Sequence, residues 1–487
     1  MSGLIKDKYK LTIGLETHLQ LNTKCKLFSY SEQNDGAQNT AICNYDIATP
    51  GVLPILNEEA IVKAIKFGLA TNSTINILSS FDRKVYTYPD LPSGYQITQY
   101  FKPIVESGYI EIDLNENEKK KINIVRAHLE QDAGKLIHDR YPDYSCVDFN
   151  RSGSVLLEIV TAPEIHNIEE VELYLRKIRN LVRYIDVSNA NMEEGEFRCD
   201  VNISIAHYES KKLGNRCEIK NLNSFKFINE AINYEIERQI DIIESGGVVE
   251  QETRLFDSVN KTTHTLRSKE NAIDYFYAPD PDLPTVQIDD NLIQSIKSSM
   301  SVSFNEMIEL YKSFSISKAN IDIITGNKSY VDYLNSLVKI NNSRINNSAL
   351  ASWMIGDFFA LLNKNNIEIN NSQITPEILF EIVYNVETEL VSGKAGKEIL
   401  LIKSKRDEKR SIEQIINELD FKQISDPVAI ENVINEIFSE FTEQVEQYRN
   451  GKTNMIGFLV GKVIQKTKNK ANPKIVNQMM LKKLSDK

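Results

Sequence analysis

Polar side chains that can bind metal ions and phosphates recur at every second position in several short segments of the sequence. Residues two apart lie on one face of a β-strand, so each segment is expected to present its polar members together. In the first segment, Glu16 and His18 alternate with Leu15 and Leu19. The later polar sets are Arg126, His128 and Glu130; Arg198, Asp200 and Asn202; and Arg216, Glu218 and Lys220. Glu158 stands alone within an apolar run.

Together, these residue types can bind a metal cation and the phosphates of a ligand. Carboxylates with His hold hard divalent cations, and Arg and Lys hold phosphates. Oxygen-rich ligation favours Mg²⁺, which usually bridges to a nucleotide. A sheet with one face in water alternates in the same way, and for any single strand this plainer explanation is the stronger one. Solvated faces usually carry Lys, Thr, Ser and Gln, however, so the segments taken together favour a metal–phosphate site.

Familiar nucleotide-binding and hydrolase motifs are missing from the sequence. Gly396-Lys397 does not end a P-loop, because Val391 stands where the first glycine is needed and Glu398 replaces the Ser or Thr. No GxGxxG follows a predicted strand, and neither HExxH nor GxSxG occurs. A chain of this sequence that uses ATP must therefore use a less common fold.

The elements that position these residues change in kind along the chain. Up to about Ile293, strand patterns and Gly/Pro turns dominate, with helices predicted after Asn57, from Ile168 with Asn167 as its cap, and from about Ser224. Beyond that point the apolar spacing is helical and Gly and Pro are sparse. The sequence therefore predicts an α+β chain with an N-terminal mixed or antiparallel sheet domain and a helical remainder.

Composition and charge describe an ordinary globular chain with a basic end. The 487 residues are 41% hydrophobic and 26% charged, with a net charge of −11. No apolar run approaches the ~18 residues of a membrane span, and five scattered cysteines indicate reduced thiols. We expect a soluble, cytoplasmic protein without a targeting signal. From residue 450 onward, nine Lys face one acidic residue, which suits either a solvated helix or contact with a polyanion.

Several longer strings match one known family together. They include IGLETHLQLNTKCKLF from Ile13, FDRKVYTYPDLPSGYQITQ from Phe81, RAHLEQDAGKLIHD from Arg126, MEEGEFRCDVNISI from Met192 and YRNGKTNMIGFLVGKVIQKTKNKANP from Tyr448. Their order and spacing resemble the B component of the glutamyl/aspartyl-tRNA amidotransferase, the GatB family, essentially end to end. The resemblance implies a catalytic cradle domain over residues 1–293, a helical linker over 294–411, and a YqeY-like tail over 412–487 that contacts tRNA.

The resemblance also implies a reaction and its partners. ATP phosphorylates the side-chain carboxylate of Glu on tRNA(Gln), or of Asp on tRNA(Asn), and ammonia then displaces the phosphate. The ammonia comes from a glutamine-hydrolysing amidase, the A component, and a small C component completes a heterotrimer. The chain is thus expected to be part of a carbon–nitrogen ligase with glutamine as nitrogen donor, with ATP and Mg²⁺ as cofactors. Neither a membrane nor DNA is an expected partner.

Carrying the family's site over residue by residue gives a defined set of expectations. The Mg²⁺ ligands are expected at Glu16, His18, Glu130 and Glu158. Beyond these family positions, we infer from residue type that phosphates or the substrate carboxylate are held by Lys84, Arg126, Arg151, Arg198 and Lys220. In the tail, the lysines expected to contact tRNA are Lys462, Lys466, Lys468, Lys470 and Lys474.

The sequence departs from the family pattern at three places. A four-cysteine zinc site found in many members would fall at Ser29, Ser31, Cys43 and Asp46, so we expect no zinc. Phe276 replaces an Arg usual before Tyr277, and Asn469 replaces a usual Gly; the effect of either on activity is open.

Two alternatives to this interpretation remain. The first is a non-catalytic tRNA-binding scaffold within the same complex, against which the intact acidic and histidine set argues. The second is the archaeal-type relative, which carries an extra domain for which 487 residues leave little room. The sequence leaves the choice between Glu-tRNA and Asp-tRNA open.

Overall fold

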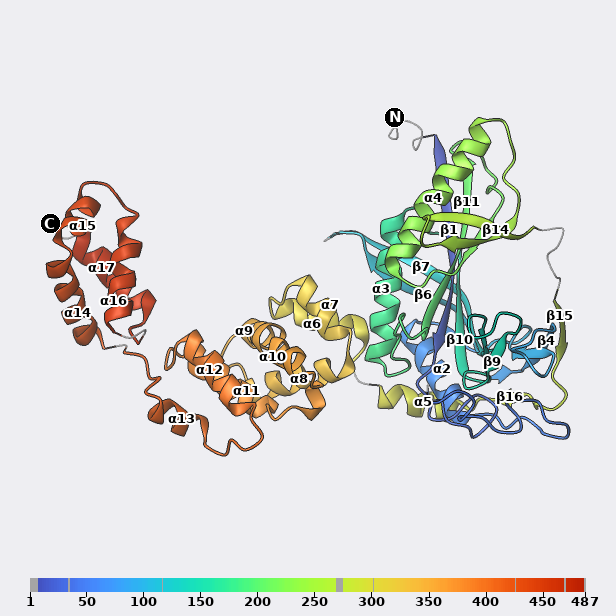
Figure 1. Cartoon of the computed structure of the whole chain (residues 1–487), viewed down its shortest axis with the longest axis horizontal. Coiled ribbons are helices and arrows are strands. Elements are labelled where there is room, and N and C mark those ends of the chain that lie inside the picture. The colour runs from blue at the N-terminus through green and yellow to red at the C-terminus, as the bar shows by residue number, and fades with distance from the viewer. Residues whose placement is uncertain are drawn as a thin grey trace. The chain divides into compact units, whose positions relative to one another are not determined.

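The computed structural model divides the chain into two compact units, residues 1–307 and 308–487. The first unit is built on β-sheets and the second is helical (Figure 1). The residues described are 8–33, 36–115, 117–268, 275–300, 302–424, 426–467 and 470–485.

A nine-stranded sheet forms the centre of the first unit. Its strand order is β14-β13-β12-β11-β1-β10-β7-β6-β2, with β12 and β13 parallel and the other neighbours antiparallel. The strands are β1 (Tyr9–Gln20), β2 (Thr74–Ile75), β6 (Val105–Asp113), β7 (Lys119–Gln131), β10 (Val155–Thr161), β11 (Phe197–His207), β12 (Cys217–Lys220), β13 (Glu252–Asp257) and β14 (Thr262–Ser268).

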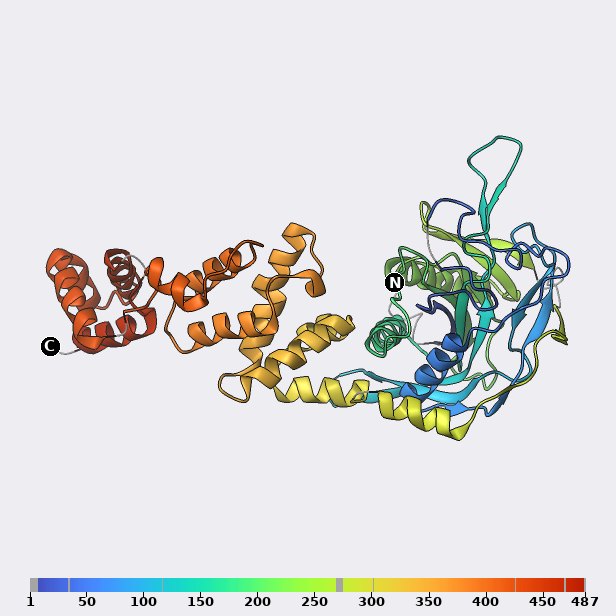
Figure 2. The same ribbon diagram turned by 90° about the horizontal axis from the view of Figure 1, so that it is seen from below.

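Three helices cover one face of this sheet, as Figures 1 and 2 show. They are α2 (Glu58–Ala70), α3 (Ile168–Tyr184) and α4 (Phe225–Glu244). Their N-caps are Asn57, Asn167 and Ser224, whose side chains accept backbone N–H bonds of the first turn. This confirms all three predicted helix starts. The odd-numbered face of β1 is buried under these helices, with Leu15 and Leu19 at most 1% exposed.

The opposite face of the sheet carries the polar side chains and is partly covered by a second, smaller sheet. Strands β15 (Phe276–Pro279), β4 (Asp82–Val85) and β5 (Tyr95–Thr98) form it in that order, and β5 packs against β7. The two short ladders of the unit are β8 (Lys135–Ile137) with β9 (Cys146–Asp148), and β3 (Leu78–Ser79) with β16 (Val286–Gln287). The small sheet removes part of the polar face from water.

The predicted alternation fails at one residue of β7. The alternation of Arg126, His128 and Glu130 predicts that the intervening Val125, Ala127 and Leu129 share the core face. Val125 is instead 52% exposed, whereas the other two are fully buried. The register between β7 and β10 shifts at this point, between Val160 and Thr161. An extra residue in one strand of a pair turns the chain and reverses the faces on its two sides. Periodicity alone does not reveal such a bulge.

The second unit consists of short helices. They are α7 (Lys318–Thr325), α8 (Lys328–Asn341), α9 (Asn347–Trp353), α10 (Phe359–Asn365), α11 (Pro376–Glu387), α12 (Gly393–Lys403), α13 (Ile412–Glu418), α14 (Pro427–Glu440), α15 (Thr442–Arg449), α16 (Met455–Lys466) and α17 (Pro473–Ser485). Two more, α5 (Asp290–Ser299) and α6 (Phe304–Ser313), lead from the first unit. The last four helices enclose their own core, in which Ile434, Leu459 and Met480 are fully buried.

Helix α13 begins directly after the predicted domain boundary at residue 411. We expected α13 to belong to the tail, but it packs against α11 and α12, because its apolar residues Ile412 and Ile415 are buried there. The division into three domains otherwise stays a prediction. The fold class is confirmed, with a sheet domain first and helices after it. None of the helices in the described residues has the length and hydrophobicity that crossing a membrane requires.

The two faces of β1 should respond very differently to truncation. Leu19 lies between Leu157 of β10 and Phe197 of β11, all of them buried. We expect Leu19→Ala to lower the free energy of unfolding by about 2–5 kcal/mol through lost burial and a residual cavity. The neighbouring control Gln20→Ala, on the opposite face, should stay within about 0.5 kcal/mol. Urea unfolding of both variants checks this; equal losses would contradict the assignment of faces.

Candidate metal centre

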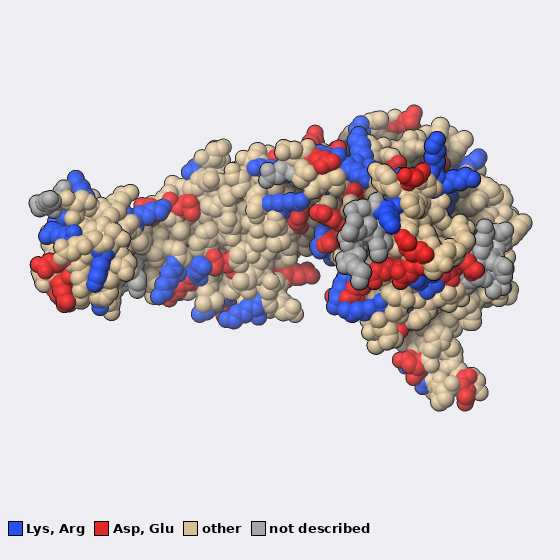
Figure 3. Space-filling view, turned by 90° about the horizontal axis from the view of Figure 1, so that it is seen from above, with Lys and Arg blue, Asp and Glu red and all other residues tan. Residues whose placement is uncertain are grey.

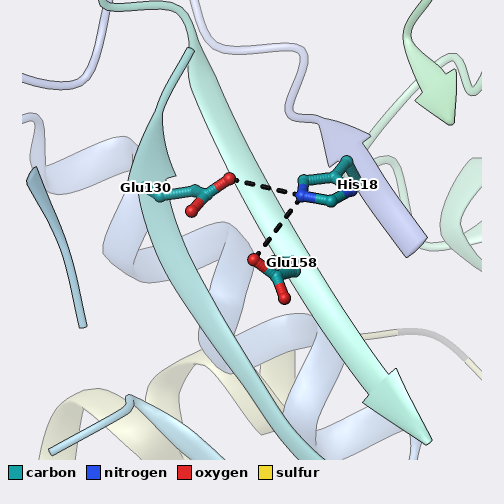
Figure 4. Close-up of side chains that lie close together, drawn as sticks. All are labelled: His18, Glu130 and Glu158. Carbon is teal, nitrogen blue, oxygen red and sulfur yellow. Dashed lines mark ion pairs between the residues drawn. The ribbon is translucent and has the colours of Figure 1, made fainter. Parts of the chain in front are cut away.

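Three side chains from three adjacent strands meet on the polar face of the sheet (Figure 4). His18 of β1 is paired directly with Glu158 of β10, and Glu130 comes from β7 on the far side of β10. His18 Nε2 lies 3.5 Å from Glu130 Oε1 and 3.5 Å from Glu158 Oε2. One possible ligand atom from each of the three lies within 4.8 Å of the others. This spacing allows one cation to contact all three.

The centre is largely withdrawn from water, which perturbs its titration. Burial and the charge of Glu158 raise the pKa of Glu130. Burial also opposes charge on Glu158 and His18, but their mutual attraction outweighs it. The pKa of Glu158 is therefore held well below its usual range by His128 and His18, and the pKa of His18 is raised to about 9 by Glu158 and Glu130. Two buried carboxylates thus demand positive charge between them, and an imidazole with two carboxylates is a donor set that suits a divalent cation.

His128 also belongs to this centre, although it was not among the expected ligands. Its Nε2 lies 3.3 Å from Glu158 Oε2 and 3.9 Å from Glu130 Oε2, and the residue is 4% exposed. Within the described chain, its Nδ1 has no hydrogen-bond partner. The alternation of Arg126, His128 and Glu130 already placed it on this face. Its contact with Glu158 is of the kind that orients a ligating carboxylate.

Glu16, the fourth expected ligand, lies beside the three-residue cluster. Its carboxylate accepts a hydrogen bond from Asn202 Nδ2 at 2.8 Å. Burial, then the charges of Glu158 and Glu218, raise the pKa of Glu16. The structure thus brings Glu16 close enough to Glu158 to sense its charge, while its hydrogen bond is directed to β11.

The expected basic residues divide into two groups by their partners. Lys220 Nζ lies 2.6 Å from Asp200 Oδ2 and 2.8 Å from Glu218 Oε1. Arg198 and Arg151 both contact Asp132, from Nη2 at 2.5 Å and from Nε at 3.4 Å respectively. Asp200 and Glu218 lay on predicted polar faces. Asp132 was missed, although it continues the 126, 128, 130 alternation by one step beyond the strand.

Lys84 and Arg126 rest on aromatic rings instead. Lys84 Nζ lies 4.6 Å from the ring centroid of Tyr275, and Arg126 Cζ lies 5.8 Å from that of Tyr100. Neither forms an ion pair with another described residue, and Lys84 lies close enough to Glu130 for its charge to act on the Glu130 pKa. Cations held this way keep their N–H groups available for oxyanions.

Tyr277 joins the centre from the small sheet. Its ring stacks on that of Tyr100 with centroids 3.9 Å apart. Burial, followed by the charge of Glu158, raises the pKa of Tyr277 to about 12. The preceding Phe276, which departs from the family pattern, is 68% exposed. Asn469, the other departure, lies outside the described residues.

The four positions of the family's zinc site are joined here by hydrogen bonds around one carboxylate. Ser29 Oγ donates to Asp46 Oδ1 at 2.8 Å, and Ser31 Oγ donates to Asp46 Oδ2 at 2.6 Å. The backbone N–H of Cys43 donates to Oδ2 at 2.9 Å. Lys26 Nζ lies 3.2 Å from Asp46 Oδ2, and both side chains are fully buried. We refer to this cluster as the Asp46 hub.

The expected tRNA-contacting lysines lie on α16 and around its junction with α17. Three of them have carboxylate partners: Lys466 with Glu436 and Glu440, Lys470 with Asp420, and Lys474 with Glu389. Lys462 lies over the rings of Phe441 and Phe458, and Lys468 lies outside the described residues. On the face of residues 308–487 seen in Figure 3, acidic and basic side chains are accordingly interspersed.

Comparisons with known proteins agree along the whole chain. A family model described as the GatB/GatE catalytic domain matches residues 11–294, and one described as the GatB domain matches residues 332–484. Curated relatives named as the B component of aspartyl/glutamyl-tRNA(Asn/Gln) amidotransferase are similar end to end. That of Coxiella burnetii is 43% identical over 98% of this chain and 100% of its own length, and that of Alkalilimnicola ehrlichii is 42% identical over 98% and 99%.

These matches place the chain among the components of tRNA-dependent amidotransferases that carry a GatB/GatE catalytic domain. More narrowly, the chain belongs to the GatB family, the B components of aspartyl/glutamyl-tRNA(Asn/Gln) amidotransferases. The resemblance drawn from the sequence strings is thereby confirmed.

The Asp46 hub leads to a prediction about zinc and stability. Cys43 is the only thiol among the four positions, so elemental analysis of the purified protein should find no stoichiometric zinc. Asp46→Ala should lower the free energy of unfolding by about 3–5 kcal/mol, because it leaves the Lys26 ammonium buried without a counter-charge. Ser31→Ala, which removes one hydrogen bond, should cost about 1 kcal/mol. Zinc at one ion per chain, or a silent Asp46→Ala, would show that the loop is held differently.

Proposed function

We propose that the chain activates the side-chain carboxylate of Glu on tRNA(Gln), or of Asp on tRNA(Asn), by ATP-dependent phosphorylation. A glutaminase partner, the amidase of the complex, supplies the ammonia that completes amidation, and a small third chain completes the heterotrimer. The observation that carries the proposal is the largely buried cluster of His18, Glu130 and Glu158, with the basic Arg198 on the same face of the sheet. The proposal is supported by the end-to-end similarity of the chain to proteins named as part of aspartyl/glutamyl-tRNA(Asn/Gln) amidotransferases.

The proposed chemistry explains why a carboxylate needs activation. A carboxylate oxygen attacks the γ-phosphorus of ATP, the bond to the ADP oxygen breaks, and an acyl phosphate forms. Ammonia then attacks the carbonyl carbon, and inorganic phosphate leaves with the bonding electron pair in place of a poor hydroxide leaving group. Phosphoryl transfer of this kind needs positioning and charge neutralisation more than a covalent catalyst.

The residues of the centre have separate tasks in this proposal. His18 Nε2 and the carboxylates of Glu130 and Glu158 would hold Mg²⁺, and Glu16 stands beside them as a further oxygen donor. When bound, Mg²⁺ supplies neutralising charge to phosphoryl oxygens. Lys84 and Arg126, whose N–H groups are not committed to carboxylates, bind phosphoryl oxygens directly. Burial of the centre limits competition from water for the activated carboxylate.

Removing a cluster residue tests the proposal against a purely scaffolding role. In the complex assembled with its partners, His18→Ala and Glu130→Ala should each lower ATP-dependent amidation by at least about 100-fold. The glutaminase activity of the partner should remain, because that reaction is carried out by another chain.

His207→Ala is the matched control, since this histidine lies at the exposed end of β11. The complex that carries His207→Ala should amidate both mischarged tRNAs at the wild-type rate. Near wild-type amidation by His18→Ala or Glu130→Ala would overturn the catalytic assignment and favour the scaffold.

The tail lysines generate a prediction about salt. If Lys462, Lys466, Lys470 and Lys474 contact the tRNA backbone, affinity should fall steeply as salt rises, by counterion release. The carboxylate partners of Lys466, Lys470 and Lys474 do not prevent this, because exposed ion pairs contribute only about 0–1 kcal/mol and exchange readily. Deleting residues 426–487, which leaves α13 packed on α11 and α12, should raise the KM for mischarged tRNA and flatten the salt dependence.

The measurement is tRNA affinity of intact and truncated complexes across a salt series. Lys405→Ala with Lys409→Ala, two exposed lysines before α13, serves as the control for loss of charge elsewhere. Identical affinity and slope for intact and truncated complexes would mean that the tail is only a solvated surface.

A further inference from the structure

Asp132 connects two arginines on the polar face of the sheet. It follows the end of β7, and its side chain is 7% exposed. Its Oδ2 accepts a hydrogen bond from Arg198 Nη2 at 2.5 Å and lies 3.4 Å from Arg151 Nε. Its Oδ1 accepts the backbone N–H of Ala133 at 2.9 Å. The carboxylate is therefore fixed by the backbone on one side and directed to two guanidinium groups on the other.

Arg198 depends on this contact for its direction. In the part of the chain that the structure describes, Asp132 is the one carboxylate in ion-pair contact with it, and the buried Nε of Arg198 has no hydrogen-bond partner. Arg151 is less dependent, because its Nε and Nη2 also donate to the carbonyls of Ala133 and Gly134, at 3.1 Å and 2.7 Å. Arg198 is paired across the strands with His18. The orientation of the Arg198 guanidinium therefore determines whether positive charge faces the metal centre from β11.

The exposure of the partners distinguishes this contact from a structural ion pair. Asp132 is nearly enclosed, whereas the side chains of Arg198 and Arg151 are 34% and 41% exposed. In the Asp46 hub, by contrast, Lys26 and Asp46 are both 0% exposed. A buried carboxylate that presents partly open guanidinium groups leaves their remaining N–H donors for an oxyanion.

We propose that Asp132 is a positioning residue that aims the Arg198 guanidinium, with Arg151 beside it, at the phosphoryl oxygens bound next to His18. The inference rests on the proposed phosphoryl transfer and assigns its oxyanion contact on the β11 side. A guanidinium binds phosphoryl oxygens through a planar fork whose orientation must be set beforehand. Nη2 donates to Asp132, which leaves Nη1 and Nε without a carboxylate partner among the described residues. Asp132 itself touches no reacting atom.

The test compares Asp132→Asn with Glu170→Gln in the assembled complex. Glu170 is equally buried, with a 7% exposed side chain, and pairs with Lys120 at 2.7 Å, but it lies at the start of α3 on the helix-covered side. Asp132→Asn should lower kcat for ATP-dependent amidation about 10- to 100-fold. The KM for mischarged tRNA and the partner's glutaminase activity should not change. Glu170→Gln should leave kcat at the wild-type value.

Two further readouts separate positioning from a loss of folding. Inhibition by ADP with orthovanadate, a mimic of the transferred phosphoryl group, should weaken by the same factor as kcat, whereas the KM for ATP changes less. In a double-mutant cycle, Asp132→Asn should add little to Arg198→Lys, because the lysine has already removed the fork that Asp132 orients.

The possible failures are distinguishable. Wild-type kcat in Asp132→Asn, or full additivity with Arg198→Lys, overturns the positioning role and leaves the proposed function intact. If Glu170→Gln lowers kcat by the same factor, the positioning role is also overturned, because the loss of any buried carboxylate would then have the same effect. Absence of ATP-dependent amidation in the wild-type complex overturns the proposed function and this inference together.

Discussion

The burial of two carboxylates beside one another is the constraint on which the first unit depends. Glu130 and Glu158 lie on neighbouring strands under a second sheet, where unpaired negative charge is unfavourable. His18 and His128 approach from the strands on either side of β10, and both contact Glu158, at 3.5 Å and 3.3 Å. The core face of the same strands makes this possible, because its apolar side chains are buried against helices α2, α3 and α4.

Much of this arrangement follows from the sequence by alternation. Leu15 and Leu19 mark the core face of β1, so Glu16 and His18 had to share the other face, and the same logic placed Glu130, Arg198 and Lys220. Alternation gives the face but not the neighbours. That His18 meets Glu130 and Glu158 more directly than Glu16 does is set by strand register, which depends on turns and on bulges such as the one at Val125. Asp132 falls on the same two-residue step but lies just beyond the strand end, and strand periodicity gives no reason to extend the polar face past that point.

The C-terminal lysines show a different limit of sequence-based prediction, because their ion-pair partners lie elsewhere in the chain. A window from residue 450 onward is strongly basic, yet the carboxylates that meet these lysines precede it in the chain: Glu436 and Glu440 on α14, and Asp420 and Glu389 further upstream. A helical bundle juxtaposes segments that a linear window separates. Charge density therefore has to be counted on the folded surface, where the excess of positive charge is smaller and divided among separate pairs.

The Asp46 hub changes the conditions to which the N-terminal loop responds. A loop closed by thiolates around a metal opens when the metal is withheld or when the sulfurs are oxidised. The hydroxyl groups of Ser29 and Ser31, by contrast, neither exchange metal nor oxidise, and Lys26 carries its positive charge as part of the chain. The shape of this loop consequently depends on the polypeptide alone. The loop therefore forms equally well in a cell that is short of metal or under oxidative stress.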